Sequence, residues 1–247
     1  MQKLVTRVLG SGPRAVLVHG GAGPQRTWEM QEPLAQRRQL VIPSRRGFNG
    51  SPATGRQDFE HDADDLLPLL EPAAHLVGFS YGGLGALIAA GRRPDLVTSL
   101  TVIEAPLFAV APADPEIEHF ERVSNEFLAD GLDARPEVLD EFLPAAALPA
   151  REAAAMPADL RCEVELARGG RLPREANPDL AAIKRAGVPV LVVSGAHLPA
   201  IDRLCDVLAD LLGARRAVLG GRGHAIPRAE GFNDCLEAFW SSTERIA

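Results

Sequence analysis

The sequence predicts an α/β fold in which helices flank a mostly parallel central sheet, and three observations support this prediction. Seven short runs rich in Val, Leu and Ile are continuous rather than alternating, which is typical of strands buried on both faces of a parallel sheet. Helical patterns lie between these runs, and such alternation is the sequence mark of an α/β sheet. A chain of 247 residues is long enough for one large domain of this kind.

The predicted elements follow one another in order along the chain. The strands are expected at Leu4–Leu9, Ala15–His19, Gln39–Pro43, His75–Phe79, Leu100–Glu104, Val188–Ser194 and Arg216–Leu219. The helices are expected at Phe59–Leu70, Tyr81–Arg92, Ala200–Leu212 and Glu230–Phe239.

One long interval, between Glu104 and Val188, interrupts the alternation. It is acidic, rich in alanine and helical in pattern, and its prolines divide it into short helices. A connection of this length rarely lacks structure of its own. We therefore expect residues 1–106 and 187–247 to form the core and residues 107–186 to form a helical cap over one edge of the sheet. A separate interaction module is the alternative.

Charge and hydropathy exclude several classes of function. The net charge of -7 disfavours nucleic-acid binding, because phosphate recognition needs a basic face. The N-terminal residues lack the apolar core of a signal peptide. No apolar run approaches the ~20 residues of a membrane span. We therefore expect a soluble, cytoplasmic protein with neither a nucleic-acid nor a membrane partner.

The three cysteines, Cys162, Cys205 and Cys235, are widely spaced. They form no CxxC pair and no zinc pattern with histidine. An odd and sparse set of cysteines suits a reducing compartment. The sequence therefore predicts three inert thiols and no metal site.

The pentapeptide Gly78-Phe79-Ser80-Tyr81-Gly82 matches G-x-S-x-G. A predicted strand precedes the motif and a predicted helix follows it, which is the context that a nucleophilic serine requires. The two glycines permit a tight turn whose central residue adopts a strained conformation. The turn is expected to expose the hydroxyl of Ser80, and the N–H of Tyr81 at the helix start is a candidate donor to an oxyanion.

A serine hydroxyl is a weak nucleophile and needs a base. His224 follows the last predicted strand, and its loop can reach over the sheet edge, so it is the predicted base. His197, on the loop after the preceding strand, is the rival. A second oxyanion donor should come from a loop after an early strand. We assign it to the N–H of Gly21, with Ala22 as the fallback.

These motifs together resemble the α/β-hydrolase superfamily, and in particular its esterase-like members with a serine nucleophile and a helical cap. The resemblance covers nearly the whole chain except the cap. It implies a sheet of about eight mostly parallel strands, a Ser–acid–His triad, and a cap that shapes the substrate pocket. The matching pieces are HGG at 19–21, RRGFNGS at 45–51, GFSYGG at 78–83, VIEAP at 102–106 and GRGH at 221–224.

The triad acid departs from the pattern of many members of the superfamily. The expected position, three residues after Gly195, is Leu198, and a leucine cannot orient an imidazole. In one interpretation Glu104, which ends an otherwise apolar strand, supplies the carboxylate, as in some enzymes that this chain resembles. In a second, Asp202 turns inward from the start of the next helix. The third possibility is that no acid functions here.

The substrate pocket is expected near Ser80 and the cap. An apolar lining would favour a small, uncharged organic substrate. The candidate lining residues are Trp28, Phe48, Tyr81, Leu107 and Phe108.

The predicted function is a serine hydrolase that acts on carboxylic esters through an acyl-enzyme intermediate. Ser80 would be the nucleophile, His224 the base and Glu104 the acid. No metal or organic cofactor is implied, and the oligomeric state, monomer or homodimer, stays open. Two alternatives remain: a lyase, cyclase or perhydrolase on the same fold, and a catalytically silent ligand-binding protein.

Overall fold

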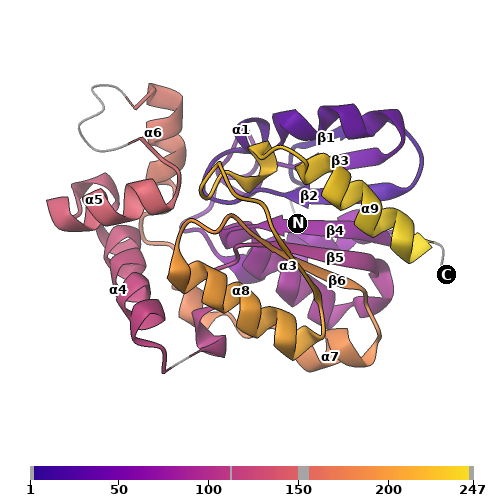
Figure 1. Cartoon of the computed structure of the whole chain (residues 1–247). Helices are drawn as coiled ribbons and strands as arrows, with labels where there is room; N and C mark the ends of the chain where they lie inside the picture. Colours follow the sequence, from indigo (N-terminus) through magenta and orange to yellow (C-terminus); the bar gives the residue numbers. More distant parts are fainter. Residues whose placement is uncertain (1–2, 112, 150–155, 245–247) are drawn as a thin grey trace.

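The computed structural model describes residues 3–111, 113–149 and 156–244. A seven-stranded sheet with the order β1-β3-β2-β4-β5-β6-β7 forms its centre, with helices on both faces (Figure 1). Strand β1 is antiparallel to β3, and the other neighbouring pairs are parallel. The strands are β1 (Thr6–Leu9), β2 (Arg14–Val18), β3 (Gln39–Pro43), β4 (Ala74–Phe79), β5 (Val97–Ile103), β6 (Val190–Ser194) and β7 (Arg215–Val218).

Helices connect the strands. The α-helices are α1 (Pro24–Trp28), α2 (Phe59–Leu66), α3 (Tyr81–Arg92), α4 (Pro115–Asp130), α5 (Pro136–Ala145), α6 (Ala158–Glu165), α7 (Leu180–Arg185), α8 (Pro199–Leu212) and α9 (Phe232–Glu244). The 3-10 segments are η1 (Glu29–Gln36), η2 (Leu67–Leu70), η3 (Pro94–Leu96), η4 (Phe108–Val110), η5 (Gly131–Asp133), η6 (Pro173–Glu175) and η7 (Ile226–Arg228).

Two apolar layers cover the sheet, because alternate residues of a strand point to opposite faces. In β2, Val16 and Val18 pack in one layer with α2, α3, α7 and α8. Ala15 and Leu17 pack in the other layer with α1, η1 and α9. Burial of each such aliphatic side chain stabilises the fold by about 1.5–3 kcal/mol. The central strands β2, β4, β5 and β6 are thus covered on both faces, as the continuous apolar runs predict.

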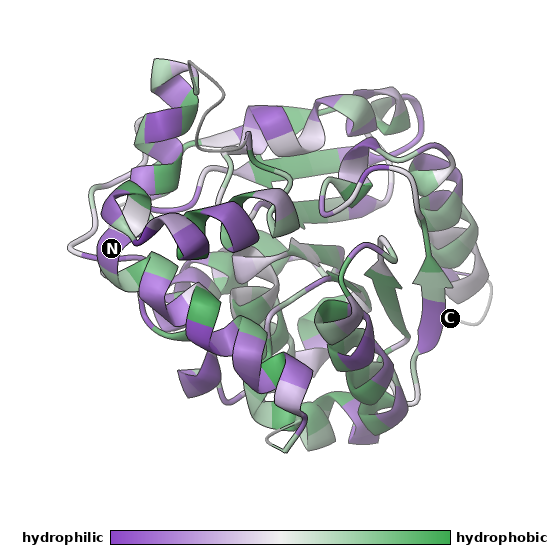
Figure 2. Cartoon of the chain, turned by 60° about the vertical axis from the view of Figure 1, so that its left-hand side comes forward, coloured by the Kyte–Doolittle hydropathy of each residue, from purple (hydrophilic) through white to green (hydrophobic). Residues whose placement is uncertain are grey.

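Helices α4, α5 and α6 lie together to one side of the sheet, at the left in Figure 1. They have a small apolar cluster of their own, which includes Val123, Phe127, Leu139 and Leu160. Hydrophilic residues are frequent on the outer surfaces of the helices, whereas the strands are largely hydrophobic (Figure 2). The described part of the predicted cap, residues 107–186, is therefore helical, with 3-10 turns and loops between its helices.

The predicted α/β fold is confirmed, with local differences. The sheet has seven strands in the described residues rather than about eight. The first strand begins at Thr6 instead of Leu4, and it is only partly buried because it lies at a sheet edge. Helix α2 ends at Leu66 and continues as a 3-10 turn, since Pro68 has no N–H for an α-helical hydrogen bond. Helix α1 was not predicted.

None of the helices within the described ranges combines the length and the apolar character that crossing a bilayer requires.

Candidate active site

Ser80 occupies a sharp turn between β4 and α3. Its backbone has φ 51° and ψ -131°, a conformation that is strained for a residue with a side chain. Neighbouring glycines allow this turn. A Cβ at Gly78 would lie 2.6 Å from that of Ala86, and one at Gly82 would lie 2.1 Å from the carbonyl oxygen of His19. The close packing of strand, helix and loop therefore requires glycine at both positions and fixes the direction of Ser80.

The side chains of Ser80, His224 and Glu104 form a hydrogen-bonded chain. Ser80 Oγ lies 2.9 Å from His224 Nε2, and His224 Nδ1 lies 2.5 Å from Glu104 Oε2. An ionised carboxylate can only accept, so Nδ1 carries the proton and Nε2 is free to accept from the serine hydroxyl. Three residues far apart in the sequence thus adopt the relative geometry of nucleophile, base and orienting acid.

Glu104 directly follows β5 and is almost completely buried, with 1% of its surface exposed. Its Oε1 accepts a hydrogen bond of 2.7 Å from the backbone N–H of Gly195 and lies 3.3 Å from His197 Nδ1. Burial alone would raise the pKa of Glu104, but its interactions with His197 and His224 outweigh burial and lower that pKa to about 2. Glu104 is therefore ionised at neutral pH.

The alternative acid, Asp202, lies in the first turn of α8. Its carboxylate contacts the hydroxyl of Ser194 and the guanidinium of Arg216, at 3.4 Å. Leu198, at the position where many superfamily members carry the acid, packs against the apolar core. Of the two candidate carboxylates, the structure places Glu104, and not Asp202, on His224.

His197, the rival base, also lies beside Glu104 rather than in contact with the serine. In the part of the chain that the structure describes, Glu104, His197 and His224 form the one group of three whose potential metal-ligating atoms lie within 4.8 Å of one another. The 2.5 Å between Glu104 Oε2 and His224 Nδ1 is shorter than the ~3 Å that separates two ligands of a tetrahedral zinc ion. The group therefore fits a set of hydrogen bonds and ion pairs better than a metal centre.

The loop that follows β2 is held by His19. Its Nδ1 donates to the carbonyl oxygen of Ala22 at 2.8 Å, and its Nε2 accepts from the backbone N–H of Arg45 at 2.9 Å. Complete burial, followed by the charge of Arg45, lowers the pKa of His19 to about 3. The imidazole is therefore neutral and makes both hydrogen bonds, so that it braces the loop.

The same loop passes close to the serine at Gly20. A Cβ at Gly20 would lie only 2.7 Å from the Cβ of Ser80, whereas a Cβ at Gly21 would meet open space. Gly21 and Ala22 both line the cavity beside Ser80. On the other side of the serine, Tyr81 is the first residue of α3, so its N–H has no acceptor within the helix. These positions are compatible with the two predicted oxyanion donors.

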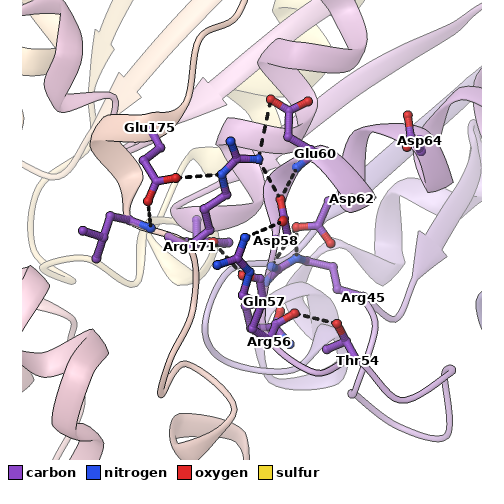
Figure 3. Close-up of polar contacts among 12 residues, drawn as sticks. Arg45, Thr54, Arg56, Gln57, Asp58, Glu60, Asp62, Asp64, Arg171 and Glu175 are labelled. Atoms are coloured by element: carbon purple, nitrogen blue, oxygen red, sulfur yellow. Dashed lines mark hydrogen bonds and ion pairs between the residues drawn. The ribbon is translucent and has the colours of Figure 1, made fainter.

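The ring of Tyr81 is fixed by two chain segments. Its hydroxyl lies 3.2 Å from the carbonyl oxygen of Gln57 and 2.9 Å from that of Arg171. Burial raises the pKa of this hydroxyl, so it remains a donor. The Arg171 side chain in turn contacts Asp58 and Glu175 (Figure 3). This network ties the chain that returns from the predicted cap to the loop before α2 and, through Tyr81, to the serine turn.

A cavity of about 460 Å³ opens beside Ser80 and His224. Phe48 and Tyr81 line it, as the sequence predicts. The segment 107–186 contributes an apolar wall that includes Phe120, Phe127, Phe142, Leu128, Leu160 and Val164.

Three predicted pocket residues do not line this cavity. Trp28 is fully buried in the layer between the sheet and α9, where its ring packs edge-on against Phe79 at 6.4 Å. Leu107 and Phe108 are buried in the opposite layer. In each case packing against the sheet places the side chain in the core. Phe120, Phe127 and Phe142 were missed, because helical periodicity alone does not tell which face of a predicted cap helix is turned to the site.

Comparison with known sequences and structures supports a family assignment. Residues 15–234 match the model of the Alpha/beta hydrolase family. The pimeloyl-[acyl-carrier protein] methyl ester esterase of Chromobacterium violaceum is 35% identical over 143 residues, which cover 57% of this chain and 56% of the relative. The protein of the same name from Methylococcus capsulatus is 33% identical over 129 residues, 51% of each chain. The chain thus matches about half the length of these curated relatives.

Solved structures share the fold. A bacterial membrane phospholipase A superposes with a TM-score of 0.72 at 23% identity, over 99% of this chain and 85% of that one. An alpha/beta hydrolase from Sphaerobacter thermophilus has a TM-score of 0.66 at 23% identity, over 96% of both chains. The family match spans most of the chain and agrees with the sheet order and the serine turn. The chain therefore belongs to the alpha/beta hydrolase family.

Proposed function

We propose that this protein is a serine hydrolase that cleaves carboxylic esters, or related acyl compounds, of small and largely apolar substrates. The observation that carries the proposal is the hydrogen-bonded chain from Ser80 Oγ to His224 Nε2 (2.9 Å) and from His224 Nδ1 to Glu104 Oε2 (2.5 Å). The names of the curated relatives, which are methyl ester esterases, point to the same type of bond.

In the first half of the proposed reaction, His224 Nε2 takes the proton of Ser80 as Oγ attacks the ester carbonyl carbon. Negative charge develops on the carbonyl oxygen, and the backbone N–H groups of Gly21 and Tyr81 would stabilise it. The tetrahedral intermediate then collapses. The bond to the alcohol breaks, His224 gives its proton to the leaving oxygen, and the acyl group stays on Ser80.

In the second half, a water molecule replaces the alcohol. His224 takes a proton from the water as its oxygen attacks the acyl carbon, and the same N–H groups would hold the second oxyanion. When this intermediate collapses, His224 returns the proton to Ser80 Oγ. The products are the free carboxylic acid and the original enzyme.

Glu104 has an electrostatic role in this scheme. It keeps the proton of neutral His224 on Nδ1, so that Nε2 faces the serine, and it stabilises the imidazolium that forms during each half-reaction. Its pKa of about 2 keeps it ionised through the whole range in which the base works. Its complete burial strengthens the interaction, because little water screens the two groups.

Residues 107–186 form, in this proposal, a cap that encloses the substrate, with residues 1–106 and 187–247 as the hydrolase core. The apolar wall that Phe120, Phe127 and Phe142 contribute to the cavity favours an uncharged acyl or alkyl group. These apolar side chains provide no charge that could pair with a charged group of a substrate. The substrate would therefore be a small organic ester.

Covalent labelling tests the proposal. Wild-type protein is treated with a fluorophosphonate, and its intact mass is measured beside Ser80→Ala and His224→Ala. We expect one adduct per chain in wild type and none in either variant. His119→Ala is the matched control, because His119 is an exposed histidine that pairs with Glu141 at 2.8 Å away from the cavity; it should label like wild type. Folded wild-type protein that admits the probe but gains no mass would rule out an activated serine.

A further inference from the structure

His197 connects the buried acid to the predicted cap. It lies on the loop after β6, and 14% of its side chain is exposed. Its Nδ1 lies 3.3 Å from Glu104 Oε1, and its Nε2 lies 2.9 Å from the carbonyl oxygen of Ala145, the last residue of α5. The imidazole thus stands between the carboxylate that orients His224 and the end of a helix that lines the cavity.

Both partners of His197 are hydrogen-bond acceptors and have no hydrogen to donate. A carbonyl oxygen is an acceptor, and the Glu104 carboxylate is ionised. A neutral imidazole has a single N–H, and the bond to Ala145 requires this N–H on Nε2. The bare Nδ1 would then point its lone pair at a carboxylate in a buried position, which is unfavourable. Nδ1 lies 3.3 Å from Glu104 Oε1, and this contact is favourable only when Nδ1 is protonated too.

The charges around His197 agree with a cation at this position. Glu104 faces it from the end of β5 and Asp202 acts on it from α8, while α5 contributes a carbonyl oxygen. His224, on the loop after β7, has its ring centroid 5.9 Å away. Burial would lower the pKa of His197, but Glu104, the Ala145 carbonyl and Asp202 outweigh burial and raise it.

We propose that His197 is a positioning residue that acts as an imidazolium, holding the Glu104 carboxylate toward His224 and holding the end of α5 over the cavity. The proposal rests on the proposed function, since Glu104 matters to activity only if His224 is the base. One carboxylate then serves two imidazoles: His224 on Oε2 and the cationic His197 on Oε1. The cation also lies near His224, whose ring centroid is 5.9 Å away, so its charge acts on the base of the proposed reaction.

The second contact of His197 concerns the substrate. Ala145, Ala146 and Ala147 all line the cavity, and the hydrogen bond from His197 Nε2 fixes the first of them. Loss of this bond should loosen the cavity wall without touching the hydrogen-bonded chain at Ser80. The two ring nitrogens therefore have separable effects: Nδ1 on the pH dependence and Nε2 on substrate binding.

The protonation state of His197 is the first test, and it needs no turnover. The ¹⁵N shifts of the histidine rings are recorded in Ser80→Ala protein between pH 5 and 9, with a His197→Gln spectrum for assignment. We expect both nitrogens of His197 to be protonated at pH 7. A bare Nδ1 at pH 7 would overturn the proposal. Because this readout does not depend on catalysis, it separates failure of this inference from failure of the serine to label.

The pH profile of kcat/KM is the second test, with two isosteric variants. In His197→Gln the amide can replace Nε2 and keep the bond to Ala145, whereas in His197→Asn the amide can replace Nδ1 toward Glu104. Both variants lack the cation, so the acidic limb should move to higher pH by about one unit in each. Only His197→Asn should raise KM, by about fivefold, the equivalent of one lost hydrogen bond.

His119→Gln provides the control for these profiles, since it removes an exposed histidine from another histidine–carboxylate pair, between α4 and α5. For this variant, the acidic limb of the pH profile of kcat/KM and the value of KM should match those of wild type. If the limbs of both His197 variants coincide with wild type while their unfolding curves show folded protein, His197 is only a packing residue and the proposal fails.

Discussion

The ends of the neighbouring strands β5 and β6 contribute different chemical groups to the surroundings of His224. At the end of β5 the chain presents a side-chain carboxylate, Glu104, directly to His224. At the end of β6 it presents the backbone N–H of Gly195, which donates to that carboxylate at 2.7 Å. The nearest carboxylate beyond β6, Asp202, is turned to Ser194 and Arg216 instead.

In the proposed triad the acid comes from the end of β5, and the comparison shows what the loop after β6 then provides. The site needs one buried anion beside His224 and donors that stabilise it. Glu104, at the end of β5, is the anion, and the loop after β6 supplies the Gly195 N–H that donates to it and places His197 Nδ1 at 3.3 Å. Two carboxylates at this place would repel each other. Asp202 and Leu198 are compatible with a carboxylate at Glu104, because neither brings a second charge to His224.

The largest expected effect is on kcat/KM, and it compares loss of the carboxylate after β5 with loss of the carboxylate after β6. Glu104→Gln should lower kcat/KM by about 10³–10⁴-fold, because an amide neither selects the right tautomer of His224 nor stabilises its imidazolium. Asp202→Asn should change kcat/KM by less than about threefold, since it affects a contact outside the hydrogen-bonded chain. Steady-state kinetics on a chromogenic short-chain ester measures both.

The reverse ranking, a large loss in Asp202→Asn with an active Glu104→Gln, would show that the acid lies beyond β6 in solution. Labelling of Ser80 by the fluorophosphonate should follow the same order as kcat/KM in the two variants.

A second prediction concerns stability against pH. The pKa of Glu104 falls from an ordinary 4.5 to about 2 in the folded protein. Its ionisation therefore stabilises the fold fully above pH 4.5, and this contribution disappears as the pH falls toward 2. The free energy of unfolding lost in Glu104→Gln should shrink by about 2 kcal/mol between pH 5 and pH 3. Urea unfolding of both proteins at several pH values measures the difference; a loss that is independent of pH would contradict the buried ion pairs.

The smallest of the three effects tests the β6 end. A Cβ at Gly195 would lie 2.3 Å from the carbonyl oxygen of Gly223, next to His224. Gly195→Ala should therefore displace the His224 loop and lower kcat/KM by about tenfold. Gly220→Ala is the matched control, because a Cβ there would meet its nearest atom, the carbonyl oxygen of Gly195, at an ordinary 3.8 Å. Equal activity of the two variants would mean that the β6 end tolerates a side chain.

The fold could be predicted from the sequence because its signals are local. Apolar runs and the glycines around Ser80 act over a few residues, so the predicted β3 and α3 have the bounds that the structure shows. Local sequence patterns predict element bounds less well at the edge of the sheet and at prolines. The exposed edge strand β1 begins late, and Pro68 converts the end of the predicted helix at Phe59–Leu70 into a 3-10 turn.

The site could be predicted only in part, because its remaining features are tertiary. The sequence leaves Glu104 and Asp202 both open, and the choice between them depends on which side chain faces His224 across the sheet edge. His197 contacts Glu104, 93 residues earlier in the sequence, and Ala145, 52 residues earlier. No local sequence pattern predicts either contact. Trp28 was expected in the pocket because it is large and apolar near the site, properties that suit the core equally well.

Tyr81 has a consequence for observation of this protein in solution. It is the single tyrosine among the 247 residues, and its hydroxyl lies between the carbonyl oxygens of Gln57 and Arg171. Biosynthetic incorporation of fluorotyrosine would therefore give one ¹⁹F resonance, positioned on the residue next to Ser80. That resonance would report acylation of the serine and movement of the chain at Arg171 without a substitution or a chemically attached group. The chain thus offers a single natural position for such a probe, at the point where the predicted cap meets the proposed nucleophile.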